Sequence, residues 1–301
     1  MIDLIIIIFF IIFIKINKKT NGRNIKDSKA CKDFKYMDKE LIIIGDIHGD
    51  YKALVEILQK ERIIDDNNEF LKNDKKIIQL GDMVNKGKNS YKSLKLLQYV
   101  QKKSENNNVI RLIGNHELMF LQNNYRYSKS EIDRKNLKNI KELIETDILN
   151  GSLKSCYNIN NLIFSHAGIT DYCINELSLK NKTINEVSDY INNRMKHFVK
   201  NNLLKDNRFN NILIDSHGIF WFRKNNEAKN FLNSNKYLQF IGHTIKNYIQ
   251  PSKDLSAIYT DIGMYNNDKI SYLIIKNNKI LIKNKKNKMW VIENFLDKYC
   301  N

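Results

Sequence analysis

The sequence predicts one α/β domain built on a parallel sheet that helices cover. Three short apolar runs, each ending in glycine and a polar residue, alternate with stretches of helical spacing, the order of repeated β-turn-α units. The chain has 301 residues, of which 42% are hydrophobic, and this is enough for a well-buried core. It contains a single proline, Pro251, and no Gly/Ser-rich linker. We therefore expect one globular domain over residues 39–301.

The first half of this domain follows the β-turn-α pattern closely. Residues 41–44, 75–80 and 109–113 are short, mostly apolar runs, as expected of strands buried on both faces of a parallel sheet. Residues 51–60 and 90–103 place apolar side chains on one face at helical spacing, which predicts two helices between the strands.

The second half is less regular. Strands are expected at residues 162–165 and 237–241, and a helix over residues 183–200. The Asn-rich stretches between these elements are interpreted as loops. Three further short strands, which we assign to a second sheet, are expected at residues 257–260, 272–276 and 280–283.

The formal net charge is +17, from 50 Lys+Arg against 33 Asp+Glu. A positive balance of this size favours anionic partners such as nucleic acid, membrane surfaces or phosphorylated proteins. The lysines are scattered along the chain, however, and the densest run, at residues 276–288, alternates with Asn and apolar residues. This pattern is typical of solvated strand edges and argues against a nucleic-acid partner. The four cysteines form no C-x-x-C pair, which argues against a zinc knuckle.

The N-terminus carries a separate signal. Residues 4–14 are apolar, a run shorter than the roughly 17–25 residues of a transmembrane helix but of the length of a signal-peptide core. We interpret residues 1–20 as a signal peptide or signal anchor and residues 21–38 as a polar spacer. This predicts a protein of the secretory pathway and endoplasmic reticulum, or one anchored to a membrane. The alternative is a cytoplasmic protein with an apolar extension.

Polar side chains follow five of the predicted strands, at the point where each strand ends. Because ligands of open α/β sheets bind outside the carboxyl ends of the strands, we expect these side chains to converge. Carboxylate, amide and imidazole ligands suit Mn, Fe or Zn, and their number is sufficient for two divalent ions. The side chains are Asp46, His48, Asp82, Asn115, His116, His166 and His243.

The five segments together resemble the signatures of the metallophosphoesterase superfamily, of the phosphoprotein phosphatase type. They read GDIHGD (45–50), GDMVNKG (81–87), GNHE (114–117), SHAG (165–168) and GHT (242–244). The run GNHELMFLQNNYRY (114–127) and Trp221-Phe222-Arg223 before the last motif are similar to the Shewanella-like branch. The resemblance covers residues 40–265. It implies the calcineurin-like fold, in which helices flank a central β-sandwich of mixed sheets in α/β/β/α layers.

The resemblance also implies a role for each metal ligand. The first ion is expected on Asp46 and His48, with Asp82 bridging the two ions. The second is expected on Asn115, His166 and His243. Two divalent ions, with manganese favoured, would activate a water for direct attack on phosphorus, without a phosphoenzyme. The implied substrate is a phosphorylated protein or a small phosphoester.

The remaining site residues are implied to act on the phosphoryl group and the leaving group. His116 would protonate the leaving oxygen as general acid. Lys86 and Arg223, together with Asn115, would bind the phosphoryl oxygens and stabilise the negative transition state.

The second motif departs from the family, which ordinarily has Asp-Arg where this chain has Asn85-Lys86. Asn85 can accept a hydrogen bond from His116 but lacks the charge that raises the histidine pKa. Lys86 keeps the positive charge and loses the planar, bidentate guanidinium. We expect a weakened catalyst. Two alternatives stay open: an ApaH-like hydrolase of dinucleoside polyphosphates or RNA caps, and a pseudophosphatase that binds phosphorylated partners with little turnover.

Overall fold

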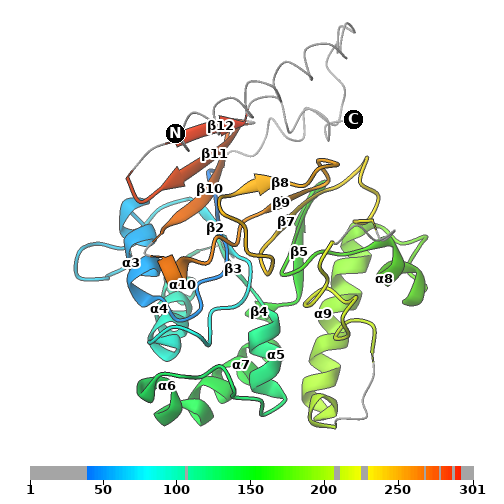
Figure 1. The fold of residues 1–301 in the computed structure, drawn as a ribbon, viewed down its shortest axis with the longest axis horizontal. Coiled ribbons are helices and arrows are strands. Elements are labelled where there is room, and N and C mark those ends of the chain that lie inside the picture. Colours follow the sequence, from blue (N-terminus) through cyan, green and yellow to red (C-terminus); the bar gives the residue numbers. More distant parts are fainter. Residues whose placement is uncertain are drawn as a thin grey trace, which may run out of the picture.

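Two mixed β-sheets form the centre of the protein (Figure 1). The computed structural model describes residues 39–105, 108–206, 211–224, 230–267, 269–277, 279–286 and 289–292. One sheet has seven strands in the order β12-β11-β10-β1-β2-β3-β4, and the other has five in the order β5-β6-β7-β9-β8. A single cluster of buried side chains includes residues of both sheets, such as Ile43 and Phe164, so the core lies between and around them.

The parallel part of the seven-stranded sheet agrees with the sequence. Strands β1 (Leu41–Ile44), β2 (Lys76–Gln79) and β3 (Val109–Leu112) pair in parallel, and β4 (Leu153–Lys154) extends them. All four residues of β1 and of β3 are buried, which explains their continuous apolar character.

The assignment of the late strands to a second sheet was wrong for two of the three. Strands β10 (Ser271–Lys276) and β11 (Lys279–Asn284) join the first sheet, where β10 lies antiparallel to β1. Strand β12 (Met289–Ile292) continues this edge. Strand β10 is stabilised by pairing with β1, whose edge would otherwise present unpaired backbone N–H and C=O groups. The apolar pattern of a strand does not specify which strand it pairs with.

The five-stranded sheet contains the predicted strands β6 (Leu162–Ser165), β7 (Leu238–Ile241) and β9 (Ala257–Tyr259), which pair in parallel. Strand β5 (Cys156–Ile159) flanks β6 and β8 (Gln250–Pro251) flanks β9, both antiparallel. The layered α/β fold expected from the sequence is therefore confirmed.

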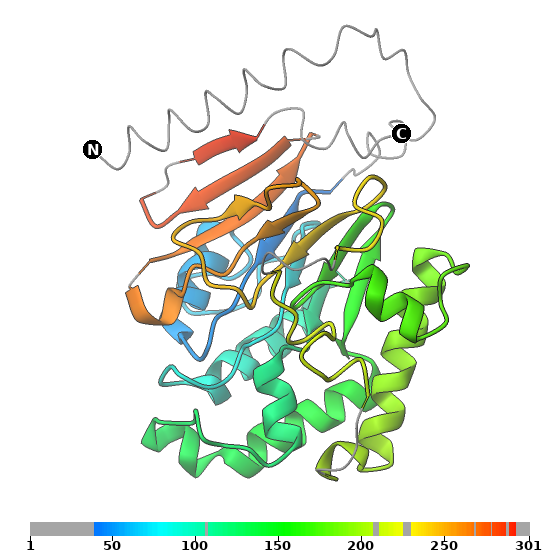
Figure 2. The ribbon, with the colours of Figure 1, turned by 45° about the vertical axis from the view of Figure 1, so that its right-hand side comes forward.

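Helices flank the two sheets, with α3 and α4 on one side and α8 and α9 on the other, while α5, α6 and α7 lie below the strands (Figures 1 and 2). Helix α3 (Tyr51–Lys60) begins at Asp50, whose side chain accepts a hydrogen bond from the Ala53 N–H, and it buries the predicted apolar face. Helix α4 (Ser90–Lys103) packs beside it. Helix α9 (Ile184–Lys200) runs along β5 and begins at a capping box formed by Thr183 and Glu186.

Several further helices, most of them short, were not predicted, because they lie in Asn-rich segments interpreted as loops or directly follow a motif. They are α5 (Asn115–Leu121), α6 (Glu131–Lys135), α7 (Leu137–Asn150), α8 (Asp171–Glu176), the 3-10 turn η1 (Leu203–Lys205) and α10 (Met264–Asn267). The proposed signal segment and spacer, residues 1–38, lie outside the described residues. Within the part of the chain that the structure describes, none of the helices combines the length and the apolar character needed to cross a bilayer.

Candidate metal centre

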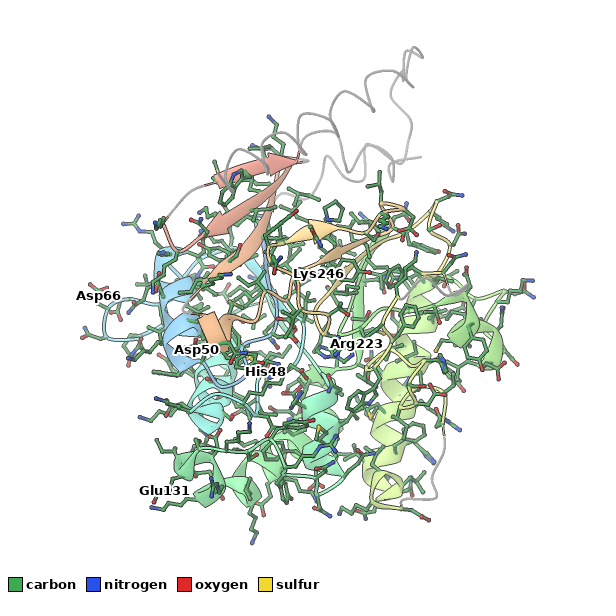
Figure 3. All side chains as sticks on the ribbon, in the orientation of Figure 1. His48, Asp50, Asp66, Glu131, Arg223 and Lys246 are labelled. Atoms are coloured by element: carbon green, nitrogen blue, oxygen red, sulfur yellow. The ribbon has the colours of Figure 1, made fainter. Side chains whose placement is uncertain are left out.

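The predicted site residues follow the carboxyl ends of strands from both sheets and meet where the sheets come together. Asp46 and His48 follow β1, Asp82 follows β2, and Asn115 opens α5 after β3. From the other sheet, His166 follows β6 and His243 follows β7. Figure 3 shows His48 in the central part of the molecule, with Arg223 across from it. The tertiary structure thus brings together side chains almost 200 residues apart.

Three of these side chains present lone pairs to one another. Nδ1 of His166 donates to the Leu80 carbonyl at 2.9 Å, and Nε2 of His243 donates to the Trp221 carbonyl at 3.1 Å. The other ring nitrogens, Nε2 of His166 and Nδ1 of His243, therefore carry lone pairs. They lie 2.8 and 2.9 Å from Oδ1 of Asn115. Three acceptors this close, with the N–H groups of both imidazoles committed to backbone carbonyls, fit a bound cation.

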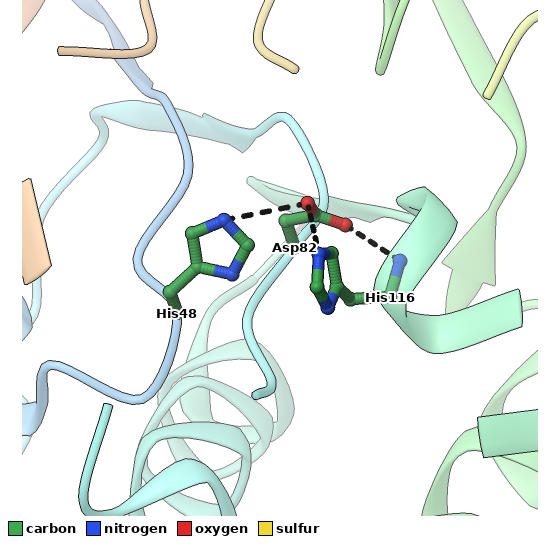
Figure 4. Close-up of side chains that lie close together, drawn as sticks. All are labelled: His48, Asp82 and His116. Atoms are coloured by element: carbon green, nitrogen blue, oxygen red, sulfur yellow. Dashed lines mark hydrogen bonds and ion pairs between the residues drawn. The ribbon is translucent and has the colours of Figure 1, made fainter. Parts of the chain in front are cut away.

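Asp82 lies between the two histidines that belong to different sheets. Its Oδ1 is 3.5 Å from Nε2 of His166. Its Oδ2 is 3.5 Å from Nε2 of His48 (Figure 4). Nδ1 of His48 donates to the Val84 carbonyl at 3.1 Å, which leaves its Nε2 facing Asp82. A carboxylate that reaches an imidazole with each oxygen fits the bridging position predicted for Asp82.

Asp46 is held by backbone at the junction of the two sheets. Both of its carboxylate oxygens accept from the His243 N–H at 3.2 Å, and its Oδ2 is 3.8 Å from Nε2 of His48. Gly242 is required at this contact, because a Cβ atom there would lie 2.0 Å from Oδ1 of Asp46.

Glu117 positions the loop that carries Asp82, a role that the sequence did not indicate. Its Oε2 accepts from the N–H groups of Gly114 and Asp82, at 2.7 and 2.8 Å. Its Oε1 accepts from the N–H groups of Met83 and Val84, at 2.9 and 3.2 Å. One buried carboxylate therefore clamps the loops after β2 and β3 together. Glu117 is the final residue of the GNHE motif, and its place in that motif is the feature of the sequence that could have pointed to this role.

Burial sets the electrostatics of the site. It raises the pKa of Asp46 well above its usual value, with the charges of Asp261 and Asp82 adding to the shift, and raises the pKa of Asp82 to about 7. The same burial lowers the pKa of His166 to about 4 and that of His243 to about 2. Uncharged imidazoles among closely spaced carboxylates are the environment that a divalent cation accommodates.

His116 lies beside this cluster on α5. Its Nε2 is 3.9 Å from Oδ2 of Asp82, and its backbone N–H donates to Oδ1 of Asp82 at 2.9 Å (Figure 4). Burial, with Lys86 adding to it, lowers the pKa of His116 to about 2. Asn85 is its partner as predicted, at 2.9 Å, but presents the amide nitrogen to Nδ1. The expectation that Asn85 accepts a hydrogen bond from His116 therefore differs from the observed orientation.

Lys86 and Asn85 sit in a strained turn. Both residues adopt positive φ, 64° and 69°, so the turn redirects two consecutive side chains. Nζ of Lys86 lies 2.7 Å from Nε2 of His48 and 5.0 Å from the centre of the Tyr265 ring. The ammonium group thus points into the centre, against a predicted metal ligand.

Arg223 reaches the centre from the five-stranded side. Its Nη1 donates to the His243 carbonyl at 2.9 Å, and its side chain is otherwise exposed. The hydrogen bond to His243 holds the Arg223 guanidinium next to the predicted ligands, where it can bind an anion that approaches them.

The comparisons with known proteins agree with this geometry. A family model described as calcineurin-like phosphoesterase matches residues 40–247, which contain all the predicted ligands. Shewanella-like protein phosphatase 1 of Plasmodium berghei is 28% identical over 165 residues, which are 48% of this chain and 44% of that relative. Shewanella-like protein phosphatase 2 of Arabidopsis thaliana is 28% identical over 91 residues, 30% of this chain and 23% of that relative. The matched stretches span less than half of either relative.

The fold is shared with solved structures. A cold-active protein-tyrosine phosphatase of a psychrophilic Shewanella species has a TM-score of 0.66 at 20% identity, and the match covers 85% of this chain and 80% of that one. The resemblance predicted from the motifs is confirmed by the relatives and by this fold. The chain belongs to the calcineurin-like phosphoesterase family.

Proposed function

We propose that this protein is a metal-dependent phosphatase that hydrolyses phosphate monoesters on phosphorylated proteins. The observation that carries the proposal is the lone-pair cluster of Asn115, His166 and His243, with Asp82 beside it and His116 at its edge. The curated relatives are named protein phosphatases, which favours a phosphoprotein as substrate.

The six ligands divide into two sets that share Asp82. Asp46 and His48 would hold one divalent ion, and Asn115, His166 and His243 the other. We favour manganese, because the mixture of oxygen and imidazole donors suits it. Two bound cations would lower the pKa of a water and neutralise the charge that develops on the phosphoryl oxygens.

The protein's own groups would act around that centre. His116 would deliver a proton to the leaving oxygen from Nε2, since Nδ1 faces Asn85. Lys86 and Arg223 would bind phosphoryl oxygens from opposite sides, with Lys86 leaving its contact with His48 when an anion enters. The ligands themselves are buried, which limits the access of bulk water to them.

A substrate comparison tests the proposal. The purified protein is assayed with Mn²⁺ against p-nitrophenyl phosphate, phosphotyrosine and phosphoserine peptides, and diadenosine tetraphosphate. We expect turnover of the monoesters. Preferential cleavage of diadenosine tetraphosphate would favour the ApaH-like alternative. Phosphopeptide binding without turnover of any substrate would favour the pseudophosphatase.

The metal requirement is tested separately. Asp82→Asn should lose bound metal and activity together, while Glu131→Gln, at an exposed ion pair with Lys135 on α6 (Figure 3), should keep both. Saturating Mn²⁺ should raise the melting temperature of the wild type, because the ions bind the folded state only. Normal metal content in Asp82→Asn would contradict the ligand assignment.

A further inference from the structure

Asp261 is a buried acid at the metal centre that the predicted ligand set does not include. It follows β9, at the same edge of the five-stranded sheet as His166 and His243. Its side chain is among the buried polar groups, with 1% of the residue exposed. The residue before it, Thr260, donates from both its N–H and its hydroxyl to the Ile241 carbonyl, at 2.8 and 2.9 Å. The end of β9 is therefore fixed beside the end of β7.

One oxygen of Asp261 has an ordinary structural task. Oδ1 accepts from the Gly263 N–H at 2.8 Å and holds the turn that leads to α10. Asn at this position could make the same hydrogen bond. The turn alone therefore does not require a carboxylate.

The turn does not explain the position of the second carboxylate oxygen, Oδ2. Among the described residues, Oδ2 receives no hydrogen bond from a donor, although it is buried. Its carboxyl group contacts that of Asp46. Burial raises the pKa of both acids; the charge of Asp261 raises that of Asp46 further, whereas the contact with Asp46 lowers that of Asp261. Two buried carboxyl groups in contact, without an ion pair to Lys or Arg for either one in the described chain, need a cation or a proton between or beside them.

The charge count of the centre favours the cation. Two divalent ions carry four positive charges, and the carboxylates assigned as ligands, Asp46 and Asp82, supply two negative ones. The charge of Glu117 is already committed to four backbone N–H groups. Among the residues that the structure describes, Asp261 is the remaining buried carboxylate that interacts with both Asp46 and Asp82.

We propose that Asp261 is a positioning residue of the metal centre, whose second carboxylate oxygen supports Asp46 and adds the third negative charge that retains the ion on the Asp46 side. This inference rests on the proposed metal centre. Residues behind the direct ligands fix their orientation and typically contribute about 10- to 100-fold to metal affinity.

Asp261→Asn is the informative substitution, because it keeps the acceptor for the Gly263 N–H and removes the charge. We expect its affinity for Mn²⁺, measured by calorimetric titration of the metal-free protein, to fall by about 10-fold or more. In the metal-free protein we expect an equal or higher melting temperature, since repulsion from Asp46 is relieved. The rise in melting temperature caused by Mn²⁺ should shrink correspondingly. Asp254→Asn removes an acid from the same part of the chain and should leave the affinity unchanged.

A purely structural Asp261 gives a different result. If Asp261→Asn keeps the wild-type affinity for Mn²⁺ within about twofold, the inference is overturned, whatever happens to the melting temperature. Should the Asn variant not fold, Asp261→Ser, which retains a side-chain acceptor, is measured in the same way and judged by the same criterion. Failure of the proposed function appears elsewhere, as a wild-type protein that binds no Mn²⁺.

Discussion

The amide nitrogen of Asn85 lies 2.9 Å from Nδ1 of His116, and the amide oxygen of the same side chain accepts a hydrogen bond of 2.6 Å from the Ser128 hydroxyl. A donor facing Nδ1 favours the neutral imidazole, whose proton is on Nε2. The family's aspartate would accept from Nδ1–H and favour the imidazolium. The orientation of one amide thus disfavours the protonated form that a general acid needs.

Asn85→Asp should therefore restore acid catalysis selectively. An alkyl leaving group such as serine needs protonation, whereas p-nitrophenolate leaves with little help. We expect kcat for a phosphoserine peptide to rise by about 10²-fold, near the lower end of the effect of general acid catalysis, and kcat for p-nitrophenyl phosphate to change far less. The wild type should consequently favour aryl esters such as phosphotyrosine.

Lys86→Arg is the matched control for Asn85→Asp. It changes the neighbouring group that would bind the phosphoryl oxygens, which both substrates share, so it should alter both rates by a similar factor. Equal improvement of both substrates by Asn85→Asp, or of neither, would show that Asn85 does not orient His116.

Glu117→Gln should destabilise the fold and the centre together. Glutamine offers one acceptor oxygen and turns its NH₂ group towards two of the four backbone N–H groups that the carboxylate now binds. We expect the free energy of unfolding in urea to fall by about 2 to 4 kcal/mol, because buried donors lose their acceptor. Glu131→Gln, at an exposed helix pair with Lys135, should change it by less than about 1 kcal/mol. If the free energy of unfolding of Glu117→Gln equals that of the wild type, Glu117 does not hold the loops after β2 and β3 together.

Glu61 should make stability depend on pH. Burial alone would raise its pKa, but hydrogen bonds from Lys283 at 2.8 Å and Tyr272 at 2.5 Å outweigh burial and hold the pKa below its ordinary value. Because the folded pKa is the lower one, the stabilisation is fully present above the unfolded pKa, about 4.3, and is lost as pH falls through the folded pKa. The difference in unfolding free energy between wild type and Glu61→Gln should be largest near pH 7 and shrink below about pH 4. Glu56→Gln, in the helix that ends just before Glu61, removes an acid whose ion-pair partner within the described residues is Lys60, and it should show a smaller difference at pH 7. A Glu61→Gln difference that is constant from pH 7 to pH 3 would contradict the linkage.

The N-terminal segment makes a prediction about localisation. A reporter fused to residues 1–30 should enter the secretory pathway, and replacing Ile7 and Ile8 by Lys should prevent this, because charge in the apolar run blocks insertion. A diffuse cytosolic reporter would retire the signal-segment hypothesis. Cys156 and Cys173, which are buried and unpaired in this structure, would then be expected to stay reduced.

The sequence by itself determined the elements that local pattern controls. Helix α3 spans the predicted residues, since its apolar positions recur with the helical period and Asp50 caps its start. The motif residues after β1, β2, β3, β6 and β7 could be placed together because the carboxyl ends of parallel strands share one edge. Their chemical types then indicated metal binding without any coordinates.

Only the tertiary structure decided which strands are neighbours and how side chains are turned. The pairing of Leu41 with Ile275 joins strands more than 200 residues apart, and an apolar strand carries no local mark of its partner. Asp261 falls outside the recognised motifs, so its place beside Asp46 depends on the crossing of β9 next to β7. The amide of Asn85 is oriented by Ser128 and His116, two contacts that form only when the loops after β2 and α5 close over each other. Each of these relationships depends on contacts between segments that are far apart in the sequence. They are therefore decided by packing of the whole fold and not by any short stretch of residues.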